Sequence, residues 1–293
     1  MVGGKRWNPI AVANNAALGL LSLLTLYPFW YVAASSFSSS RAITSGEVFL
    51  WPIEFNVDAY KRLLDDGQLL VSAKNTILIT AVGTLLNMVM TVLAAYPLSK
   101  KRLMGRSGLL LFITFTMLFV SGMIPNFILI KTLGLMNSYW SLWLPALIST
   151  YNLFVMKTYF EGLPEEIEES ASIDGANDLT ILLKIALPLS KPILAALSLF
   201  YAVGWWNSYF QVLLYITRST KQTLMVKLYQ MINQVDASLL NGAGGSEGAS
   251  QVLLTPEAVK AAAIVLSVTP ILCVYPFLQR HFVKGVLIGS VKG

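Results

Sequence analysis

Six long stretches without Asp, Glu, Lys or Arg constrain this chain more than any other feature of its sequence. A helix that crosses the hydrocarbon core of a membrane needs about 20 mainly apolar residues, and its backbone polar groups must all be paired within the protein. Charged side chains are costly there, so they mark the ends of such helices. The chain is therefore predicted to be all-α, a polytopic membrane protein with six transmembrane helices. The stretches are residues 7–40, 75–99, 107–130, 132–156, 192–217 and 261–279.

Composition supports this prediction. Hydrophobic residues make up 55% of the chain and charged residues 12%, whereas soluble domains usually contain about 25% charged residues. A single cysteine, Cys273, excludes an internal disulfide and a cysteine-cluster metal site, and a single histidine, His281, leaves little for histidine-based catalysis. We expect one transmembrane domain over residues 1–293, surrounded by membrane lipid, with no metal site, no catalytic residues and no nucleic-acid partner.

Lysine and arginine residues in short loops predict how the helices are oriented. Lys100, Lys101, Arg102 and Arg106 lie between the second and third stretches with no acid among them, and both ends of the chain are also basic. An even number of spans places both ends on one side. We therefore expect both termini in the cytoplasm, together with a loop at residues 161–191. The two external segments are then residues 37–73 and 218–259.

The external segments carry two further signals. Asn56 or Asp58 is expected to cap a short helix over residues 58–64. The glycine-rich run at residues 241–245 is flexible by composition. It is either a plain linker or a probe that touches an external partner.

The loop at residues 161–191 is the most charged part of the chain, since its first 18 residues contain 7 of the 15 acidic residues. Pro164 predicts the start of a helix, and acids in the next turn meet the positive end of the helix dipole. Gly175 is expected to end this helix, at a position that needs a positive φ. A second helix is expected to begin near Asn177 or Asp178. The loop is thus predicted to be a helix–Gly–helix elbow.

A narrow apolar stripe follows one face of the first of these helices. It consists of Leu163, Ile167 and Ala171, which are spaced four residues apart. From this pattern alone two interpretations stay open. The elbow is either an amphipathic hairpin that lies on its own protein or on the membrane, or a surface that a partner covers.

The same loop holds Glu169-Ser170-Ala171, Asp174-Gly175-Ala176, Ile185, Leu187-Pro188 and Pro192 over 24 residues. This pattern resembles the EAA motif of bacterial ABC importer permeases, with Ser170 where the second residue is usually Ala. The resemblance implies the type I permease fold, in which this loop is the coupling helix that docks in a groove of the ATP-hydrolysing subunit. The candidates for ATPase coupling are then Glu169, Ser170, Ala171, Asp174, Gly175, Ala176, Leu187 and Pro188.

Other stretches extend the resemblance over most of the chain. Residues 122–125, 133–138, 201–207 and 282–289 look like the oligo- and polysaccharide branch of carbohydrate permeases. Within that branch the chain resembles the second, shorter permease of a pair, of the kind found in alginate importers.

The resemblance implies a set of partners in the bacterial cytoplasmic (inner) membrane. They are a second homologous permease in a heterodimer, two ATP-binding subunits, an extracytoplasmic solute-binding protein and an oligosaccharide. This chain has no GxxxxGK[ST] phosphate loop. We therefore expect it to be a transport subunit without a cofactor and not an enzyme, with ATP and Mg bound by the partner ATPase.

The stretch at 192–217 carries the best candidates for a sugar pathway. Aromatic rings stack on sugar rings, and a polar side chain at this depth usually faces protein or water. The alternative for each ring is an interfacial aromatic belt or packing against lipid. For Asn87 two roles stay open, a place in the lining of the pathway or hydrogen bonds that bind helices together. The candidates are Trp205, Trp206, Asn207 and Tyr209, with Ser121, Asn126 and Asn152 as weaker ones.

Two other classes of function are weighed from the residues alone. A membrane enzyme that acts on glycans or lipids needs convergent acids or histidines near the membrane, whereas the acids here cluster in one loop. An independent secondary transporter typically needs ionisable residues inside its spans, and the six stretches were defined by having none.

Overall fold

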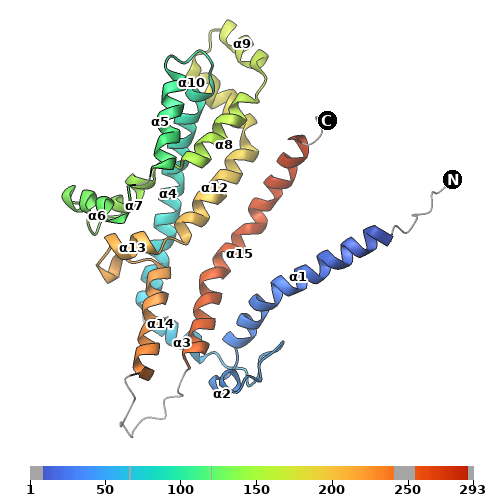
Figure 1. The fold of residues 1–293 in the computed structure, drawn as a ribbon, viewed down its shortest axis with the longest axis vertical. Helices are drawn as coiled ribbons and strands as arrows, with labels where there is room; N and C mark the ends of the chain where they lie inside the picture. Colours follow the sequence, from blue (N-terminus) through green and yellow to red (C-terminus); the bar gives the residue numbers. More distant parts are fainter. Residues whose placement is uncertain (1–8, 66, 120, 241–254, 290–293) are drawn as a thin grey trace, which may run out of the picture. The chain divides into compact units, whose positions relative to one another are not determined.

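The computed structural model describes residues 9–65, 67–119, 121–240 and 255–289, and every regular element in these ranges is a helix (Figure 1). This confirms the predicted all-α class. The chain divides into two compact units, one of residues 1–67 with 228–269 and one of residues 68–227 with 270–293. The expectation of a single domain stays a prediction.

The first unit begins with α1 (Pro9–Ser36), which covers the first predicted span. Its described side chains are exposed as far as Trp30, among them Leu23 at 72% and Phe29 at 67%. A helix that is apolar on all sides needs a surrounding of protein or of lipid. The exposure of α1 therefore fits a helix that crosses a membrane.

The segment after α1 folds on itself around α2 (Ser40–Thr44) and α3 (Asp58–Asp65). α3 confirms the predicted short helix, and Asn56 Oδ1 accepts a hydrogen bond from the Asp58 backbone N–H at 2.6 Å, as expected of a capping residue. A small core buries the apolar side of this segment, and it consists of Ala34, Ala42 and Val48.

Two helices lie near the end of the chain, α14 (Leu224–Leu240) and α15 (Pro256–Gly289). α15 contains the sixth predicted span and extends it at both ends. The glycine-rich run at 241–245 lies outside the described residues.

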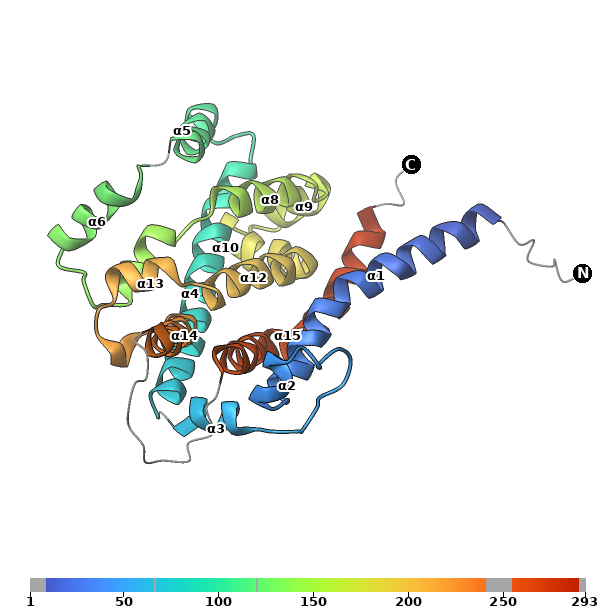
Figure 2. The ribbon, with the colours of Figure 1, turned by 60° about the horizontal axis from the view of Figure 1, so that its bottom comes forward.

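The second unit is built around α4 (Gln68–Ser99), a helix of 32 residues. α8 (Thr150–Glu161) and α12 (Lys191–Trp206) pack along it (Figures 1 and 2). α4 begins before the predicted span 75–99, so the end of the predicted external segment 37–73 is helical from Gln68 onward. Small and polar side chains at every third or fourth position let the neighbouring helices approach α4 closely. The buried ones include Ser72, Thr76, Gly83, Asn87, Thr91 and Ala95.

Three predicted spans of this unit are each divided into two or more helical segments. Pro125 lies in the first turn of α6 and Pro145 in η1, both positions where the missing backbone N–H needs no helical partner. Each of these prolines belongs to a new helical segment, and α12 ends at Trp206 before Asn207. The segments are α5 (Arg106–Leu118) and α6 (Met123–Thr132), then α7 (Trp140–Trp143), η1 (Leu144–Ala146) and α8, then α12 and α13 (Phe210–Tyr215).

Three helices of the described part of the chain are long and apolar enough to cross a membrane. Two pairs of helices are long and apolar enough only when taken together, and each pair is sharply bent. The pairs are α5 with α6 and residues 178–189 with α12, and the count rises to five if each pair is one span. The number of six spans therefore stays a prediction. The three long helices cover Val12–Ser36, Gln68–Ser99 and Pro256–Cys273.

Asn137 ties the loop between α6 and α7 to the segment that follows α13. Its φ is 60°, in the left-handed region that Asn tolerates better than most residues. Its Oδ1 accepts hydrogen bonds from the backbone N–H groups of Thr217 and Arg218 at 2.8 and 2.9 Å. Lys221 in η3 (Ser219–Lys221) donates to the Asn137 carbonyl at 2.9 Å. Asn137 thus holds the loop before α7 against the segment that follows α13.

Candidate substrate pocket and coupling surface

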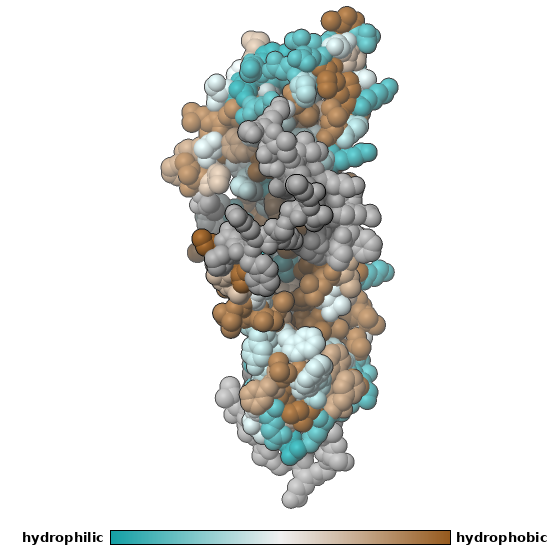
Figure 3. Space-filling view, turned by 90° about the vertical axis from the view of Figure 1, so that its right-hand side faces the viewer, coloured by the Kyte–Doolittle hydropathy of each residue, from teal (hydrophilic) through white to brown (hydrophobic). Residues whose placement is uncertain are grey.

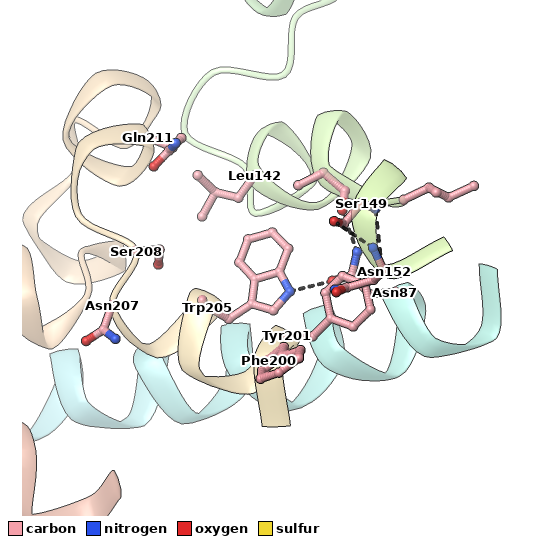
Figure 4. A pocket seen from close by; sticks show the side chains of 13 residues that line it. Asn87, Leu142, Ser149, Asn152, Phe200, Tyr201, Trp205, Asn207, Ser208 and Gln211 are labelled. Atoms are coloured by element: carbon pink, nitrogen blue, oxygen red, sulfur yellow. Dashed lines mark hydrogen bonds between the residues drawn. The ribbon is translucent and has the colours of Figure 1, made fainter. Parts of the chain in front are cut away.

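A pocket of about 490 Å³ opens where α4, α12 and the segment between α7 and α8 meet (Figure 4). Its lining combines aromatic rings with amide and hydroxyl groups, and it contains no Asp, Glu, Lys or Arg. The lining residues are Asn87, Leu142, Ala146, Ile148, Ser149, Asn152, Phe200, Tyr201, Gly204, Trp205, Asn207, Ser208 and Gln211.

Asn87 joins three segments at the wall of this pocket. Its Nδ2 donates to the backbone carbonyls of Ala146 and, at 2.8 Å, of Leu147, which lie at the break between η1 and α8. Its Oδ1 accepts a hydrogen bond from Trp205 Nε1 at 2.6 Å. Because Asn87 is only 1% exposed, these bonds satisfy an amide that is expensive to leave unpaired. Asn87 therefore binds α4 to α12 and to the segment before α8, which is one of the two roles considered for it.

Tyr201 forms a second link between α4 and α12, one turn before Trp205. Its hydroxyl lies 2.7 Å from Thr91 Oγ1 on α4 and accepts a hydrogen bond from the Ser149 backbone N–H at 3.3 Å. Tyr201 is 7% exposed and Trp205 9%. Both rings are therefore held between helices instead of facing lipid, which argues against an aromatic belt at these two positions.

Polar side chains stand on both sides of Trp205 in the view of Figure 4, with Asn207 and Gln211 on one side and Ser149 and Asn152 on the other. Ser208 also lines the pocket, and its Oγ is buried without a hydrogen-bond partner. A ligand rich in hydroxyl groups can satisfy such atoms, since each hydroxyl both donates and accepts. The lining therefore suits the hydroxyl-bearing faces of a sugar, and it contains no cation of its own.

The structure brings together three of the residues expected from the sequence to form a sugar pathway, Trp205, Asn207 and Asn152. Trp206 and Tyr209 do not line the pocket. The remaining two candidates lie elsewhere, where the Ser121 hydroxyl donates to Asn126 Oδ1 at 2.8 Å near the start of α6.

Sequence reasoning missed several lining residues. Tyr201 carries a usable signal, because it lies four residues before Trp205 and so shares its helix face. Phe200 lies inside α12 next to Tyr201 and resembles ordinary packing. Ser149, Ser208 and Gln211 carry no signal, since they lie at or just after the interruptions of the predicted spans.

The acidic loop forms the predicted elbow. α9 (Glu165–Ile173) has three acids in its first turn, and the Asn177 side chain caps α10 (Asp178–Ile181) by accepting from the Thr180 backbone N–H at 2.8 Å. Gly175 between them has a φ of +84°. The Ala176 N–H donates to the Ala171 carbonyl at 2.9 Å, which closes the turn in the way expected for a glycine-ended helix. These observations confirm the local predictions.

The motif residues divide into an inward and an outward set. Ala171, Ala176 and Leu187 are half-buried and pack on the core that α4, α8 and α12 share. The outward set is exposed, and no atom lies within 4 Å of the position that a Cβ at Gly175 would take. It consists of Glu169, Ser170, Asp174, Gly175 and Pro188.

The apolar stripe gives a mixed result. Leu163 and Ala171 pack on the core, as the interpretation of a hairpin on its own protein expects, whereas Ile167 is 41% exposed. The most exposed apolar side chains of the elbow are Ile173 at 86% and Leu179 at 58%. The uncovered apolar surface therefore lies at the tip of the elbow, next to Gly175.

A basic loop at residues 100–106 lies against the elbow, and a groove of about 700 Å³ opens between them. On the face seen in Figure 3, hydrophilic residues gather at the end of the second unit that carries α9. The ion pairs are Lys100–Glu168, Lys101–Glu165 at 3.7 Å, Arg102–Asp178 and Arg106–Glu161.

These ion pairs differ in burial. The side chains of Lys100 and Glu168 are only 19% and 18% exposed, whereas those of Arg102 and Asp178 are 67% and 65% exposed. Lys100 Nζ also lies 4.5 Å from the centre of the Tyr96 ring near the end of α4. Lys100 therefore links α4 firmly to α9, and the exposed pair adds little.

The other acids of the elbow face outward. Among the described residues Glu166, Glu169 and Asp174 have no ion pair, while four of the seven acids are paired within the chain. Four acids therefore hold the elbow against the basic loop. Only Glu166, Glu169 and Asp174 keep a carboxylate available for contact with a partner.

Leu187 and Pro188 form the corner that leads from the elbow into α12. η2 (Leu182–Ala186) is a π-helical turn directly before α11 (Leu187–Leu189), and such turns commonly occur where the regular hydrogen-bond ladder is disturbed. Residues 178–189 meet α12 at an angle of 83°. Tyr159 of α8 donates to the Leu189 carbonyl at 3.1 Å and holds the corner in place.

The described residues contain no group of three or more His, Cys, Asp or Glu side chains that could hold a metal ion.

Comparison with known proteins agrees with this arrangement. Residues 77–288 match the family described as "Binding-protein-dependent transport system inner membrane component". The chain is 44% identical to protein LplC of Bacillus subtilis, over 96% of this chain and 94% of LplC. It is 42% identical to the polygalacturonan/rhamnogalacturonan transport system permease protein YtcP of the same organism, over 94% and 95% of the two chains.

A solved structure shares the fold. A chain from a bacterial ABC transporter involved in the import of the acidic polysaccharide alginate superposes with a TM-score of 0.82 and 34% sequence identity, over 96% of this chain and 99% of that one.

Proposed function

Because the chain belongs to the family of binding-protein-dependent transport system inner membrane components and is a permease subunit of a sugar ABC importer, we propose that it carries oligosaccharides derived from an acidic polysaccharide. The substrate class rests on the polygalacturonan/rhamnogalacturonan permease and the alginate transporter that it resembles. Alginate-derived oligosaccharides are the first candidates. An external binding protein delivers them.

The pocket around Trp205 is the proposed place where the sugar passes this chain. The observation that carries this proposal is the combination of buried aromatic rings, Tyr201 and Trp205, with uncharged polar side chains in one pocket. Rings stack on the apolar faces of sugars while amides and hydroxyls bond to sugar hydroxyl groups. The pocket has no cation, so the uronate carboxylates of an acidic sugar are balanced outside this lining.

The outward face of the elbow is the proposed contact with an ATP-hydrolysing subunit. Glu169, Ser170, Asp174 and Gly175 are exposed there, and Ile173 adds an uncovered apolar side chain. Charged groups beside one apolar anchor are typical of a protein interface. The partner subunit binds ATP and Mg, and its movement reaches α12 through the corner at Leu187 and Pro188.

The proposed assembly contains this chain, a second homologous permease in a heterodimer and two ATP-binding subunits in the cytoplasmic membrane. The exposed apolar helices α1 and α5 face lipid or these subunits. Both termini and the elbow lie in the cytoplasm, because Lys100, Lys101, Arg102 and Arg106 form a short loop rich in basic residues.

The substrate is tested by reconstituting the complete transporter with its binding protein in lipid vesicles. Uptake of short alginate and polygalacturonate oligosaccharides is measured beside uptake of neutral maltodextrins. We expect ATP-dependent uptake of an acidic oligosaccharide and none of the neutral ones. Uptake of neutral sugars alone contradicts the proposed substrate class, and uptake without ATP contradicts the ABC mechanism.

The coupling role is tested with Gly175→Arg. Its matched control is Gly175→Ala, because both variants place a side chain at the same positive φ but only arginine fills the open space on the elbow. We expect Gly175→Arg to abolish sugar-stimulated ATPase activity and Gly175→Ala to retain most of it. Equal activities of the two variants contradict docking at this surface.

A further inference from the structure

Three residues of α4 stand in line opposite two aromatic residues of α12. Gly83, Asn87 and Thr91 are spaced four residues apart and so share one face of α4. Tyr201 and Trp205 have the same spacing on α12. Asn87 is hydrogen-bonded to Trp205 and Thr91 to Tyr201, so each polar residue of α4 meets one ring of the pocket.

The Trp205 ring is fixed by a bond on one side and by close packing on the other. Asn87 Oδ1 holds Nε1 at 2.6 Å. A Cβ at Gly83 would lie 2.6 Å from the Cε2 and Nε1 atoms of the ring, so the ring occupies the space that this glycine leaves. A side chain at residue 83 would therefore force the ring or the backbone of α4 to shift, and loss of the Asn87 amide would leave Nε1 without this partner.

The Tyr201 hydroxyl is held from two directions. It is bonded to Thr91 Oγ1 at 2.7 Å, and the Ser149 backbone N–H donates to it at 3.3 Å. Thr91 is fully buried and does not line the pocket. Any effect of Thr91 on a ligand must therefore pass through the position of Tyr201.

We infer that Gly83, Asn87 and Thr91 are positioning residues of the sugar pathway, which hold Tyr201 and Trp205 as a preset wall for a sugar ring. A wall that is ordered before binding spares the ligand the cost of ordering it. This inference rests on the proposed passage of the sugar through the pocket. It assigns to α4 a part in substrate handling beyond that of a packing partner.

Thr91→Val tests the inference, with Thr91→Ser as the matched control. Valine keeps the shape of threonine and removes the bond to Tyr201, whereas serine keeps the hydroxyl. The measurement is the number of alginate oligosaccharides imported per ATP hydrolysed by the complete transporter in vesicles. This ratio does not depend on the amount of folded transporter in the vesicles.

We expect Thr91→Val to lower the ratio about fivefold, the factor that corresponds to the loss of one hydrogen bond. Thr91→Ser should retain the wild-type ratio. In a Tyr201→Phe background, Thr91→Val should have no further effect, because the bond is already absent. An unchanged ratio in Thr91→Val overturns the inference, and so does an equally large effect with and without the Tyr201 hydroxyl.

The two proposals fail differently. If the wild-type transporter imports no oligosaccharide through this chain, the proposed function is wrong. If the wild type imports sugar and Thr91→Val imports the same number per ATP, only the positioning role is wrong.

Discussion

At the scale of single residues, Gly83 is the described glycine at which an added Cβ would lie closest to other atoms. The Cβ of Gly83→Ala would overlap the Trp205 ring at 2.6 Å, and overpacking of this kind typically costs about 1–3 kcal/mol. We expect a lower midpoint of thermal unfolding and reduced sugar uptake.

Gly108→Ala on α5 is the control for this prediction. No atom lies within 4 Å of a Cβ there, and alanine is the better helix former by about 1 kcal/mol. Gly108→Ala should therefore unfold at the same temperature as the wild type or higher. Equal destabilisation by the two alanine variants would falsify the close-approach argument.

Glu54 provides a pH-dependent contact in the segment after α1. The hydrogen bond from the Arg41 guanidinium, followed by that from the Ser39 hydroxyl, holds the pKa of the Glu54 carboxyl below its ordinary value. A carboxyl whose pKa is depressed by folding stabilises the fold above its unfolded pKa, and that contribution is lost as the pH falls. Because the group is exposed, the effect is local.

The prediction concerns hydrogen exchange at the Ser39 amide, which donates to the Ile53 carbonyl at 3.1 Å. In the wild type, protection corrected for the intrinsic exchange rate should fall when the pH drops below about 4, near the ordinary pKa of glutamate. Glu54→Gln should show the lower protection at neutral pH as well. Protection that is the same in both proteins at every pH contradicts the role of this carboxylate.

Single residues also show how far sequence reasoning extends. Trp205 and Asn207 were found because aromatic and amide side chains stand out in an apolar stretch. Tyr201 was missed although its spacing of four residues from Trp205 places both on one helix face. Gln211 was missed because it follows a helix break that hydropathy does not reveal. Asn87 left two interpretations open, and the structure is compatible with both, because its three hydrogen bonds join helices while it also lines the pocket.

At the scale of elements, the link between α4 and α9 depends on the half-buried pair Lys100–Glu168. Lys100→Met leaves the Glu168 carboxylate without its partner, which should cost about 2 kcal/mol, less than the loss of one partner from a fully buried pair. Arg102→Met is the control, because the Arg102–Asp178 pair is largely exposed and should cost less than about 0.5 kcal/mol.

Thermal unfolding of the two variants in detergent distinguishes these expectations. A clear loss in Lys100→Met with little change in Arg102→Met supports the link. If both variants unfold at the wild-type temperature, α9 is held by its apolar contacts alone.

The elbow was predictable as an element and its surroundings were not. Its helix start, its glycine turn and the capping Asn177 follow from local rules on residues that are neighbours in sequence. The pairing with the basic loop joins residues 55 to 76 positions apart, and no local pattern encodes such a contact. Pro125 and Pro145 lie inside predicted spans, but whether a proline kinks a helix or starts a new one depends on the packing around it.

At the scale of the whole molecule, the number and orientation of the spans is the central prediction. Single cysteines are placed in a Cys273→Ser protein and labelled with a membrane-impermeant maleimide in right-side-out vesicles. Ser45→Cys and Leu133→Cys should be labelled from outside, and Ser172→Cys only after permeabilisation. All three positions are exposed, so accessibility depends on the side of the membrane.

Leu133 decides the number of spans. If the bent pair α5 and α6 crosses the membrane as one span, residue 133 lies outside. If the pair is re-entrant, labelling of Leu133→Cys requires permeabilisation, and the six-span arrangement is wrong.

The ion pairs between the basic loop and the elbow also have a consequence for biosynthesis. The ribosome completes Lys100 and Arg102 before their partners, which follow 68 and 76 residues later. At about 5–20 residues per second this interval is roughly 3–15 s. During that time the nascent basic loop has no carboxylate of the elbow to bind and is free to hold anionic lipid headgroups. The proposed coupling surface therefore forms only after the acids of the elbow have been synthesised and can pair with the basic loop.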